Sequence, residues 1–416
     1  MKKQKSIKII TKYWGEIDPN SLESYRRKSG YEALRKALRQ DSEVILQEII
    51  KSGLRGRGGA GFLTGAKWQL AAEKNSSKKY FIANLNESEP GVFKDRLLAE
   101  NNPHQIVEGL IIAAYAVGAT RAFIYLNPCY KKAKMLLENA LREAYEKKIL
   151  GKSVMGSFFE LEIEVFEGAG SYVCGEESAL VNSMEGRRAE PRKRPPFVCE
   201  QGLENFPTVV NNVETLANIP EIILNGADNY RHLGAIDSPG TKLFCIDGSV
   251  ESPGLYEALL GVTTRELIYD YAGGVQRGKD FLLAQIGGVG GFFAPTGLLD
   301  EPLVYGRNTK LALGSGGILV LDKMVDWKKL MVSWMRFFQR ESCGKCVPCR
   351  EGTFRALAIL RRLEQGDFSE DDLKDLKKII WALEKTSFCA FGRFAANGIK
   401  EVMRYELVQD FKERLI

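Results

Sequence analysis

Three cysteines, each separated from the next by two residues, are the strongest chemical signal in this sequence. They occupy the segment Cys343-Gly-Lys-Cys346-Val-Pro-Cys349, and Cys389 follows farther along the chain. Thiolates at this spacing point toward one small volume, which suits the corners of a 4Fe-4S cluster. A zinc ion is the alternative, but structural zinc sites usually have two separated Cys-x-x-Cys pairs, and Cys389 has no near cysteine partner. We therefore predict one 4Fe-4S cluster with Cys389 as its fourth ligand.

A glycine-rich segment at residues 53–67 supplies the second signal. It reads GLRGRGGAGFLTGAK and contains one formal G-x-G-x-x-G pattern. The residues before it look helical, whereas the dinucleotide fingerprint needs a strand there, so we do not expect an ordinary Rossmann turn. Glycines let backbone N–H groups approach a ligand closely, and Arg55, Arg57 and Lys67 add positive charge. The segment predicts a phosphate-binding loop, with a flexible surface loop as the alternative.

Polar loops follow two of the expected strands. The segment 84–91 (NLNESEPG) ends one apolar run, and the segment 168–177 (GAGSYVCGEE) follows another. Because open parallel sheets bind ligands at the carboxyl ends of their strands, we expect both loops to meet at one crevice. Amides can hydrogen-bond the edges of a heteroaromatic ring, and carboxylates can accept ribose hydroxyls. The first loop also fits an ordinary turn, and the segments 191–197 (PRKRPPF) and 211–215 (NNVET) fit a basic turn and a helix cap.

The elements expected around these motifs form an α/β protein. From residue 80 onward, short apolar runs alternate with longer amphipathic stretches, which is typical of a mostly parallel sheet covered by helices. The expected strands span 80–85, 122–126 and 161–166. Helices are expected before residue 50, from Pro103, up to Leu150 and over 211–224.

The chain divides into four expected regions. Residues 1–75 are an N-terminal helical segment with the glycine-rich loop, and residues 76–238 are a Rossmann-like α/β domain with a parallel sheet. Two strands, a helix and further strands between 239 and 325 follow the order of a small ubiquitin-like (β-grasp) α+β domain. Residues 326–416 show only helical periodicity, so we expect a helical bundle that carries the clustered cysteines.

The composition is that of a folded globular protein. The 416 residues are 44% hydrophobic and 27% charged, which excludes fibrous and largely disordered chains. The longest charge-free run, 281–299, contains five glycines and a proline, so we expect no membrane span. The apolar stretch near the basic N-terminus is too short for a signal peptide, which favours cytosolic residence.

The net charge of +6 does not indicate nucleic-acid binding. Residues 1–60 contain 14 Lys and Arg against 7 Asp and Glu, so the excess lies in this head. The head either steers anions such as dinucleotides or is a solvated face. The sequence has only two histidines, His104 and His232, which argues against chemistry that depends on imidazole acid and base groups.

A phosphate cradle, amide-rich strand-end loops and an iron-sulfur cluster together suit one task. They indicate two-electron oxidation of a dinucleotide, with the electrons leaving one at a time. A flavin is the cofactor that links these two steps, because it accepts a hydride and releases single electrons. Little acid or base machinery is needed, in agreement with the scarcity of histidine.

With these motifs in order, the sequence resembles a known family, the flavin-bearing NADH-oxidising subunit (51 kDa family) of respiratory complex I, NADH:quinone oxidoreductase. The motifs GLRGRGGAGF, NESEPG, GAGSYVCGEE and ESCGKCVPCREG occur in the family order between Gly53 and Cys389. The resemblance implies FMN, one 4Fe-4S cluster on Cys343, Cys346, Cys349 and Cys389, and NADH as substrate. Residues 76–238 would then be the FMN- and NADH-binding domain.

The resemblance also implies roles for single residues in the crevice. The FMN and nucleotide contacts implied in the glycine-rich loop are Gly56, Arg57, Gly58, Gly59 and Lys67. The FMN contacts implied elsewhere are Asn84, Asn86, Glu87, Ser88, Asn211, Asn212 and Thr215. The nicotinamide and ribose side is implied for Glu89, Tyr172, Glu176 and Glu177, and Gly175 is implied as a further cofactor contact. The NADH contacts also include Lys67, Arg194 and the adenine-stacking Phe62 and Phe197.

No catalytic side chain is expected, because the hydride passes directly from NADH to the flavin and the protein orients the reactants. Glu177 is expected near the nicotinamide. The sequence departs from the family at two positions: Asn86 stands where aspartate is usual, and Arg194 stands where lysine is common. Both changes bear on cofactor affinity and potential, and neither changes the class.

The resemblance implies two protein partners, a thioredoxin-like 2Fe-2S subunit (24 kDa family) and a larger iron-sulfur subunit that leads toward quinone. The expected location is cytoplasmic, in a complex attached peripherally to the inner face of the cell membrane, without nucleic acid. One rival is a diaphorase subunit of an NAD-reducing hydrogenase or formate dehydrogenase, although the chain has no further cysteine triplet. The other is a non-catalytic, zinc-stapled, anion-binding scaffold.

The other four cysteines have no closely spaced cysteine partner. We expect them to be small buried hydrophobic residues, with Cys174 the one nearest the flavin site. They are Cys129, Cys174, Cys199 and Cys245.

Overall fold

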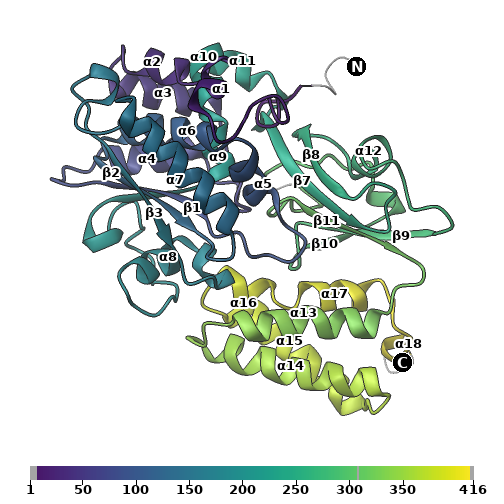
Figure 1. The fold of residues 1–416 in the computed structure, drawn as a ribbon. Coiled ribbons are helices and arrows are strands. Elements are labelled where there is room, and N and C mark those ends of the chain that lie inside the picture. The colour runs from purple at the N-terminus through teal and green to yellow at the C-terminus, as the bar shows by residue number, and fades with distance from the viewer. Residues whose placement is uncertain (1–6, 307–308, 413–416) are drawn as a thin grey trace.

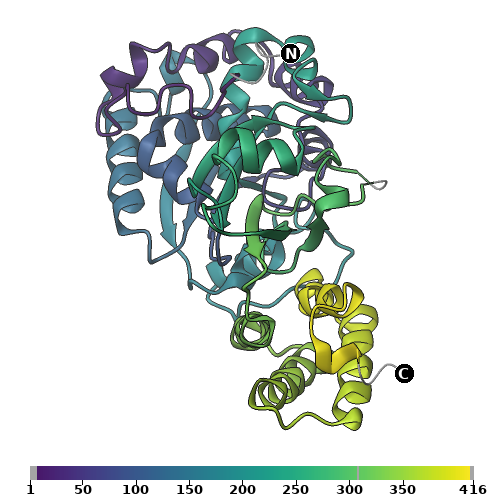
Figure 2. The ribbon, with the colours of Figure 1, turned by 90° about the vertical axis from the view of Figure 1, so that its right-hand side faces the viewer.

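The computed structural model describes residues 7–306 and 309–412. Figure 1 shows three parts: a parallel sheet under the N-terminal helices, a second sheet beside it, and a group of helices below both. In the perpendicular view of Figure 2, the C-terminal helices form a lobe beneath the two sheets.

The first sheet has four parallel strands in the order β3-β2-β1-β4. The strands are β1 (Tyr80–Leu85), β2 (Arg121–Leu126), β3 (Glu162–Glu167) and β4 (Thr208–Asn212). In β1, Phe81, Ala83 and Leu85 join one hydrophobic core, while Tyr80 and Ile82 join the core on the other face. Both faces of this sheet are therefore covered, as is usual for parallel sheets.

Helices from the N-terminal half cover one face of this sheet. The helices in this half are α1 (Leu22–Arg26), α2 (Glu32–Ala37), α3 (Ser42–Ser52), α4 (Thr64–Ala72), α5 (Lys94–Asn101), α6 (Pro103–Val117) and α7 (Lys131–Glu146). Helix α6 begins where the sequence predicts, because the Asn102 side chain accepts a hydrogen bond from the Gln105 N–H and Pro103 takes the first helical position. On the other face lies α8 (Glu177–Met184), whose first N–H groups bond to the Glu176 carboxylate.

The expected helix over 211–224 was wrong in its first part. Asn211 and Asn212 end strand β4, and two helices follow, α9 (Val213–Ala217) and α10 (Ile219–Asn225). The buried pair Val209 and Val210 continues the sheet, and Asn212 then caps α9 by accepting from the Glu214 N–H. A short helix α11 (Ala227–Arg231) and the two-residue strands β5 (Gly234–Ala235) and β6 (Ser238–Pro239) complete this part.

The second sheet is mixed, with the strand order β10-β9-β11-β7-β8. Its strands are β7 (Thr241–Gly248), β8 (Gly254–Leu259), β9 (Phe281–Ile286), β10 (Phe292–Pro295) and β11 (Gly317–Asp322). Among these five strands, β7 and β11 pair in parallel and the other neighbours pair antiparallel. The helix α12 (Thr264–Glu266) lies between β8 and β9 and continues as a π-helical turn, Leu267–Tyr271. The expected α/β class is confirmed, and the two strands, helix and further strands expected between 239 and 325 are present, although the sequence did not indicate β10.

The C-terminal part contains only helices among its described residues, as expected. They are α13 (Trp327–Glu341), α14 (Val347–Gln365), α15 (Glu370–Thr386), α16 (Ala390–Phe394), α17 (Asn397–Arg404) and α18 (Gln409–Lys412). Met331, Trp334 and Phe338 lie in their shared core. The core extends to the second sheet, because the ring of Phe293 on β10 lies 6.2 Å from that of Trp334. Within the described residues, we find no helix with the length and apolar character that a membrane crossing requires.

Candidate functional site

The strand-end loops meet at the carboxyl edge of the parallel sheet, as predicted. Asn84 at the end of β1 donates from Nδ2 to the carbonyl of Gly175 at 3.0 Å. Asn86 donates from Nδ2 to the carbonyl of Ser171 at 2.8 Å and, more weakly, to Ser88 Oγ at 3.4 Å. These bonds tie the loop after β1 to the loop after β3, so both present backbone and amide groups to one crevice.

Asn86 keeps one buried acceptor free. The residue is only 1% exposed, and its Oδ1 has no hydrogen-bond partner among the described residues. A buried, unsatisfied carbonyl oxygen costs about 1–3 kcal/mol, so this atom is suited to a ligand N–H group. The edge of a flavin ring offers such a donor, and the crevice therefore fits the group that the sequence predicts.

The glycine-rich loop lies next to this edge, between α3 and α4. Gly58 is exposed, whereas its neighbour Arg57 is fully buried. A Cβ on Gly58 would lie 3.2 Å from the Cβ of Asn212, so glycine allows the loop to approach the end of β4 closely. The loop is fixed there because the Arg57 N–H donates to Thr215 Oγ1 at 2.8 Å.

The Arg57 side chain points into the protein and away from the crevice. Its guanidinium donates to the Pro239 carbonyl at 2.6 Å and to the Tyr230 hydroxyl at 3.2 Å. It also lies over the ring of Tyr305. These contacts show a structural task for the guanidinium, while the glycines after it carry the exposed backbone of the loop.

Lys67 is the cation that faces the crevice. Its Nζ contacts Glu177 Oε2 at 2.9 Å and the Val210 carbonyl at 3.2 Å. Arg194 pairs with Glu177 at 3.1 Å and also with Glu176. Burial alone would raise the pKa of Glu177, but Lys67 and Arg194 outweigh it and lower that pKa below its usual value. Glu177 is therefore held as a carboxylate at neutral pH.

Two aromatic side chains stand exposed beside these charges. Phe62, in the glycine-rich loop, is 53% exposed, and Phe197 is 45% exposed. The Arg194 guanidinium lies 5.9 Å from the centre of the Phe197 ring. Exposed rings of this kind suit stacking on a purine base. On the neighbouring helix α4, Trp68 is buried and donates to Asn211 Oδ1 at 2.7 Å.

The side chains of Glu87 and Glu89 are engaged with the protein itself. Glu87 accepts from the N–H groups of Asp95 and Arg96 at the start of α5, at 2.9 and 3.0 Å. Glu89 accepts from the Val289 N–H, in the connection between β9 and β10, at 3.1 Å. Burial raises the pKa of Glu87 to about 7 and also raises the pKa of Glu89.

Tyr172 packs against the C-terminal helices. Its ring lies 5.3 Å from that of Phe337 and 5.7 Å from that of Phe391. Burial, with the nearby charge of Glu89, raises the pKa of its hydroxyl well above the usual value. The Tyr172 side chain is therefore uncharged at neutral pH and lies between the crevice and the C-terminal helices.

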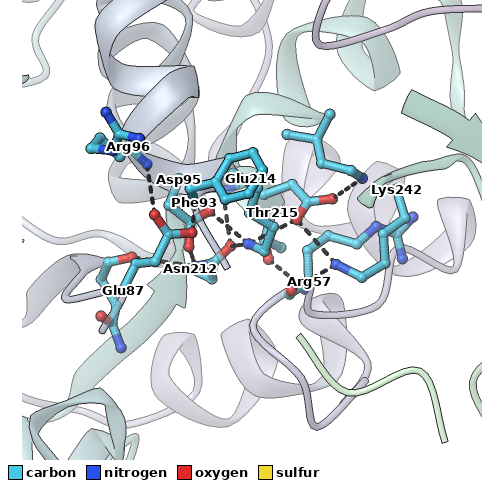
Figure 3. Close-up of polar contacts among 12 residues, drawn as sticks. Arg57, Glu87, Phe93, Asp95, Arg96, Asn212, Glu214, Thr215 and Lys242 are labelled. Carbon is cyan, nitrogen blue, oxygen red and sulfur yellow. Dashed lines mark hydrogen bonds and ion pairs between the residues drawn. The ribbon is translucent and has the colours of Figure 1, made fainter. Parts of the chain in front are cut away.

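A buried charged network, which the sequence does not indicate, lies beneath the crevice. Figure 3 shows most of its members together with Arg57, Thr215 and the capping carboxylate of Glu87. Lys94 contacts Asp95 at 2.6 Å and Glu214 at 2.9 Å, and Lys242 contacts Glu214 at 3.2 Å. Lysines and carboxylates are usually surface residues, and only the tertiary fold buries these.

The pKa values in this network follow from burial and pairing. Burial lowers the pKa of Lys242 to about 8, against the opposing pull of Glu214. Burial also acts to lower the pKa of Lys94, but Asp95 and Glu214 outweigh it and raise that pKa above its usual value. Burial would likewise raise the pKa of Glu214, but Lys242 and Lys94 lower it.

The four clustered cysteines are electrostatic neighbours. Burial raises the pKa of the Cys349 thiol to about 11, and charges on Cys346, Cys389 and Cys343 add to the rise. No three His, Cys, Asp or Glu side chains among the described residues could hold one metal ion. The donor set consists of four thiols without an imidazole or a carboxylate, which suits an iron-sulfur cluster.

The cysteine loop is tied directly to the crevice. Glu341, at the end of α13, accepts from the Tyr172 N–H at 2.7 Å and from Ser171 Oγ at 3.1 Å. Lys345, between two of the cysteines, donates to the Pro191 carbonyl at 2.7 Å. Arg188 donates to the carbonyl of Cys343. The sequence did not single out these contacts.

The remaining cysteines follow the expectation with one exception. Cys174, Cys199 and Cys245 are buried. The expectation of burial was wrong for Cys129, which is exposed. Cys129 follows the end of β2, where the chain leaves the sheet, and its N–H donates to Asn127 Oδ1 at 3.0 Å.

Two family models match the chain. Residues 49–221 match the Nuo51 FMN-binding domain, and residues 329–412 match the NADH-ubiquinone oxidoreductase-F iron-sulfur binding region. The first covers the glycine-rich loop and all four strands of the parallel sheet. The second covers the clustered cysteines, so the expected FMN and 4Fe-4S cofactors are confirmed.

Similar proteins agree with these matches. The NADH-quinone oxidoreductase F 2 subunit of Rhizobium meliloti (strain 1021) is 42% identical over 95% of this chain and 96% of that protein. The NADH-quinone oxidoreductase F subunit of Escherichia coli (strain K12) is 42% identical over 93% of this chain and 88% of that protein. The NADP-reducing hydrogenase subunit HndC of Solidesulfovibrio fructosivorans is 41% identical over 96% of this chain and 82% of that protein.

A solved structure supports the same grouping. The crystal structure of an NAD+-reducing [NiFe]-hydrogenase in the H2-reduced state has a TM-score of 0.86 and 34% identity, over 98% of this chain. This chain spans 66% of the length of that hydrogenase chain. The chain belongs to the family of NADH-quinone oxidoreductase F subunits, and it is an NADH dehydrogenase subunit with FMN and a 4Fe-4S cluster.

Proposed function

We propose that FMN lies in the crevice with its ring against Asn84 and Asn86 and its phosphate at the glycine-rich loop. The free, buried Oδ1 of Asn86 is the observation that carries this assignment. Exposed Gly58 and half-buried Gly59 follow the buried, fixed Arg57, so their backbone offers N–H groups to a phosphate.

The other residues assigned to the FMN site contribute mainly by where they lie around the phosphate and the ribityl chain. Thr215 and Asn212 lie beside the loop, where they can reach the phosphate or the ribityl chain, together with Gly56, Ser88 and Asn211. The Glu87 carboxylate bonds to the start of α5, so we assign to it the shape of the loop. We assign to the Arg57 guanidinium the anchoring of the loop rather than a direct phosphate contact.

NADH enters from the exposed side of the crevice. Phe62 and Phe197 offer faces for its adenine, and Lys67, Glu177 and Arg194 form a paired, charged border for its ribose and phosphates. Glu89, Tyr172, Gly175 and Glu176 border the nicotinamide side. None of these side chains has to react, because binding energy that orients two reactants already lowers the barrier substantially.

The bound cofactors supply the redox chemistry, since a flavin takes up a hydride and releases electrons singly to an iron-sulfur cluster. We assign Cys343, Cys346, Cys349 and Cys389 as the cluster ligands. Glu341 and Lys345 hold the cysteine loop against the crevice. Buried Trp334 and Phe338 keep water from this region.

The family supports a proposal for the partners and the location. The homologous subunits and the hydrogenase complex support a place among iron-sulfur subunits. We infer a thioredoxin-like 2Fe-2S subunit of the 24 kDa family and a larger iron-sulfur subunit as neighbours. The complex would attach peripherally to the inner face of the cell membrane, on the cytoplasmic side.

A diaphorase role is the second candidate, because HndC and the hydrogenase structure resemble this chain too. The quinone-oxidoreductase assignment is favoured because the match covers 96% and 88% of the two quinone-oxidoreductase subunits, against 82% of HndC and 66% of the hydrogenase chain. The match to an FMN-binding domain leaves the zinc-stapled scaffold without support.

The flavin assignment is tested with Asn86→Leu. We expect the dissociation constant for FMN, measured by flavin fluorescence on the apoprotein, to rise about tenfold, because one buried acceptor loses its ligand. Asn139→Ala on α7 is the matched control, since this side chain bonds only at the surface. Equal affinity in Asn86→Leu and the wild type would contradict the placement.

The cluster assignment is tested with Cys389→Ser. We expect iron content to fall and the cluster signal in the EPR spectrum, recorded after anaerobic addition of NADH, to disappear or change type. Cys129→Ser is the matched control, because this thiol is exposed and stands apart from the triplet. An unchanged spectrum in Cys389→Ser would exclude it as a ligand.

A further inference from the structure

Lys242 reaches from the second sheet to the backbone of the glycine-rich loop. It lies on β7, is fully buried, and donates from Nζ to the Arg57 carbonyl at 3.2 Å. The same Nζ contacts Glu214 Oε2 at 3.2 Å. A Cβ on Gly316 would lie 3.1 Å from this Nζ, so the neighbouring strand connection leaves the side chain little room to move.

The network continues from Glu214 to the end of strand β4. Glu214 also contacts Lys94 Nζ at 2.9 Å and accepts from the Leu243 N–H at 2.8 Å. Lys94 contacts Asp95, whose Oδ2 accepts from Asn212 Nδ2 at 2.7 Å. These contacts form one connected path between Lys242 and Asn212, and Figure 3 shows its members Lys242, Glu214, Asp95 and Asn212. The path therefore joins two groups that flank exposed Gly58.

Arg57 is held on three sides by this arrangement. Its N–H is bonded to Thr215, its carbonyl to Lys242, and its guanidinium to the Pro239 carbonyl. Two of the three partners, Pro239 on β6 and Lys242 on β7 of the second sheet, lie outside the parallel sheet. The loop is thus positioned from outside the parallel sheet, and its conformation depends on Lys242.

Arg57 is a buried cation beneath the loop without a carboxylate partner among the described residues. Its guanidinium bonds to carbonyl and hydroxyl oxygens, whereas Lys94 and Lys242 pair with Asp95 and Glu214. The buried carboxylates Glu87 and Glu89 also act on Lys94. A buried cation without a counterion is costly unless an anion lies close to it. Exposed Gly58, next to Arg57, is where such an anion can bind.

We propose that Lys242 is a positioning residue for the phosphate of FMN: it fixes the Arg57 carbonyl so that the backbone after it receives a phosphate monoester. The inference rests on the proposed placement of the FMN phosphate at the glycine-rich loop. Lys242 itself does not touch the cofactor. Its effect therefore concerns the phosphate end of the flavin and leaves the ring end unchanged.

The test compares FMN with riboflavin, which has the same ring and no phosphate. Dissociation constants for both are measured by flavin fluorescence on the full-length apoprotein of the wild type and Lys242→Met. We expect the constant for FMN to rise at least about tenfold in the variant, as a lost charged hydrogen bond and a misplaced loop would cause. The constant for riboflavin should change less than about twofold.

Glu257→Gln is the matched control. Glu257 is a buried carboxylate on β8 of the same sheet, and it accepts from the Ile9, Ile10 and Thr11 N–H groups. It lies in the same kind of buried polar contact without reaching the glycine-rich loop. We expect this variant to lower the melting temperature and to keep the wild-type ratio of FMN to riboflavin affinity.

The possible outcomes separate the two assignments. If Lys242→Met keeps the wild-type affinity ratio, or if Glu257→Gln lowers it equally, the positioning role is wrong. If the wild type binds riboflavin as tightly as FMN, the placement of the phosphate at this loop fails instead. Should Lys242→Met not fold, as judged by circular dichroism, Lys242→Gln takes its place, because it keeps a donor without the charge. A lower affinity for FMN relative to riboflavin than in the wild type would support the positioning role, and an unchanged ratio would contradict it.

Discussion

Glu87 illustrates how burial changes the role of a single carboxylate. The family resemblance places it at the flavin, and the structure shows that its side chain caps the start of α5. Burial is the largest cause that raises its pKa to about 7, and Asp95 adds to the rise while Lys94 opposes it. Near neutral pH, this residue therefore exchanges a proton while it holds the loop that carries Asn86.

The pH dependence of the free energy of unfolding should reveal the raised pKa of Glu87. The folded protein holds a proton on Glu87 between the usual value of 4.5 and about 7, whereas the unfolded chain has released it. The contribution of Glu87 is therefore fully present at low pH and is lost as the pH rises through about 7. We expect the free energy of unfolding of the apoprotein in urea to fall less between pH 5 and pH 8 in Glu87→Gln than in the wild type. Parallel curves would contradict the raised pKa.

Phe62 tests the substrate side of the crevice. Its ring is exposed, and base stacking on an aromatic side chain contributes about 1–3 kcal/mol. We expect Phe62→Ala to raise the KM for NADH roughly tenfold while the FMN content of the purified protein is unchanged. Phe158→Ala is the control, because this ring is fully exposed in a different loop. Loss of FMN with an unchanged KM would move Phe62 to the flavin side.

At the scale of elements, the crossing of α3 and α4 sets the position of Lys67. Gly65 lies at this crossing, and a Cβ there would come within 2.6 Å of the Ile50 Cα. The two helices can therefore pack closely only with glycine at this position. Lys67 and Trp68 follow in the next turn of α4, where they contact Glu177 and Asn211.

Gly65→Ala should therefore act on both stability and the site. We expect the variant to lower the free energy of unfolding by about 1–3 kcal/mol, since overpacking shifts backbone. We also expect a higher KM for NADH, because α4 moves Lys67 away from Glu177. Gly297→Ala is the matched control, because nothing lies within 4 Å of the added Cβ. Equal stability of the two variants would show that the crossing adapts freely.

The sequence predicted the elements whose buried residues recur at a regular spacing. It failed for short or polar strand segments that lack such a pattern. The apolar run of β1 and the capped start of α6 were both located correctly. The last two residues of strand β4, Asn211 and Asn212, were assigned to a helix because they also form a good helix cap. Strand β10 has only four residues and follows paired glycines, so it shows no periodic signal.

The sequence predicted the motifs that line the site but not the contacts that hold these motifs in place. The loops that carry Asn84 and Asn86 converge as their place after parallel strands required. The inward turn of Arg57 and the buried charges of Lys94 and Lys242 depend on contacts between segments far apart in the chain. A single sequence shows a lysine but not its burial.

At the scale of the whole molecule, the crevice and the cysteine loop form one continuous region. The contact of Glu341 with the Tyr172 N–H and that of Lys345 with the Pro191 carbonyl bridge the flavin-binding part and the C-terminal helices. The aromatic rings of Tyr172, Phe337 and Phe391 fill the space between them. With the cofactors placed as proposed, this arrangement separates hydride uptake at the crevice from electron release through the cysteine cluster.

The separation predicts the behaviour of Cys346→Ser in the assembled complex. We expect NADH oxidation with an artificial acceptor that reacts at the flavin to stay near the wild-type rate, because the crevice does not include Cys346. Electron transfer to the iron-sulfur partner should fall to background, since its only proposed route passes through the cluster. The two rates are compared with those of Cys129→Ser, whose exposed thiol stands outside the cluster. Unimpaired transfer to the partner in Cys346→Ser would show that electrons leave the flavin by another path.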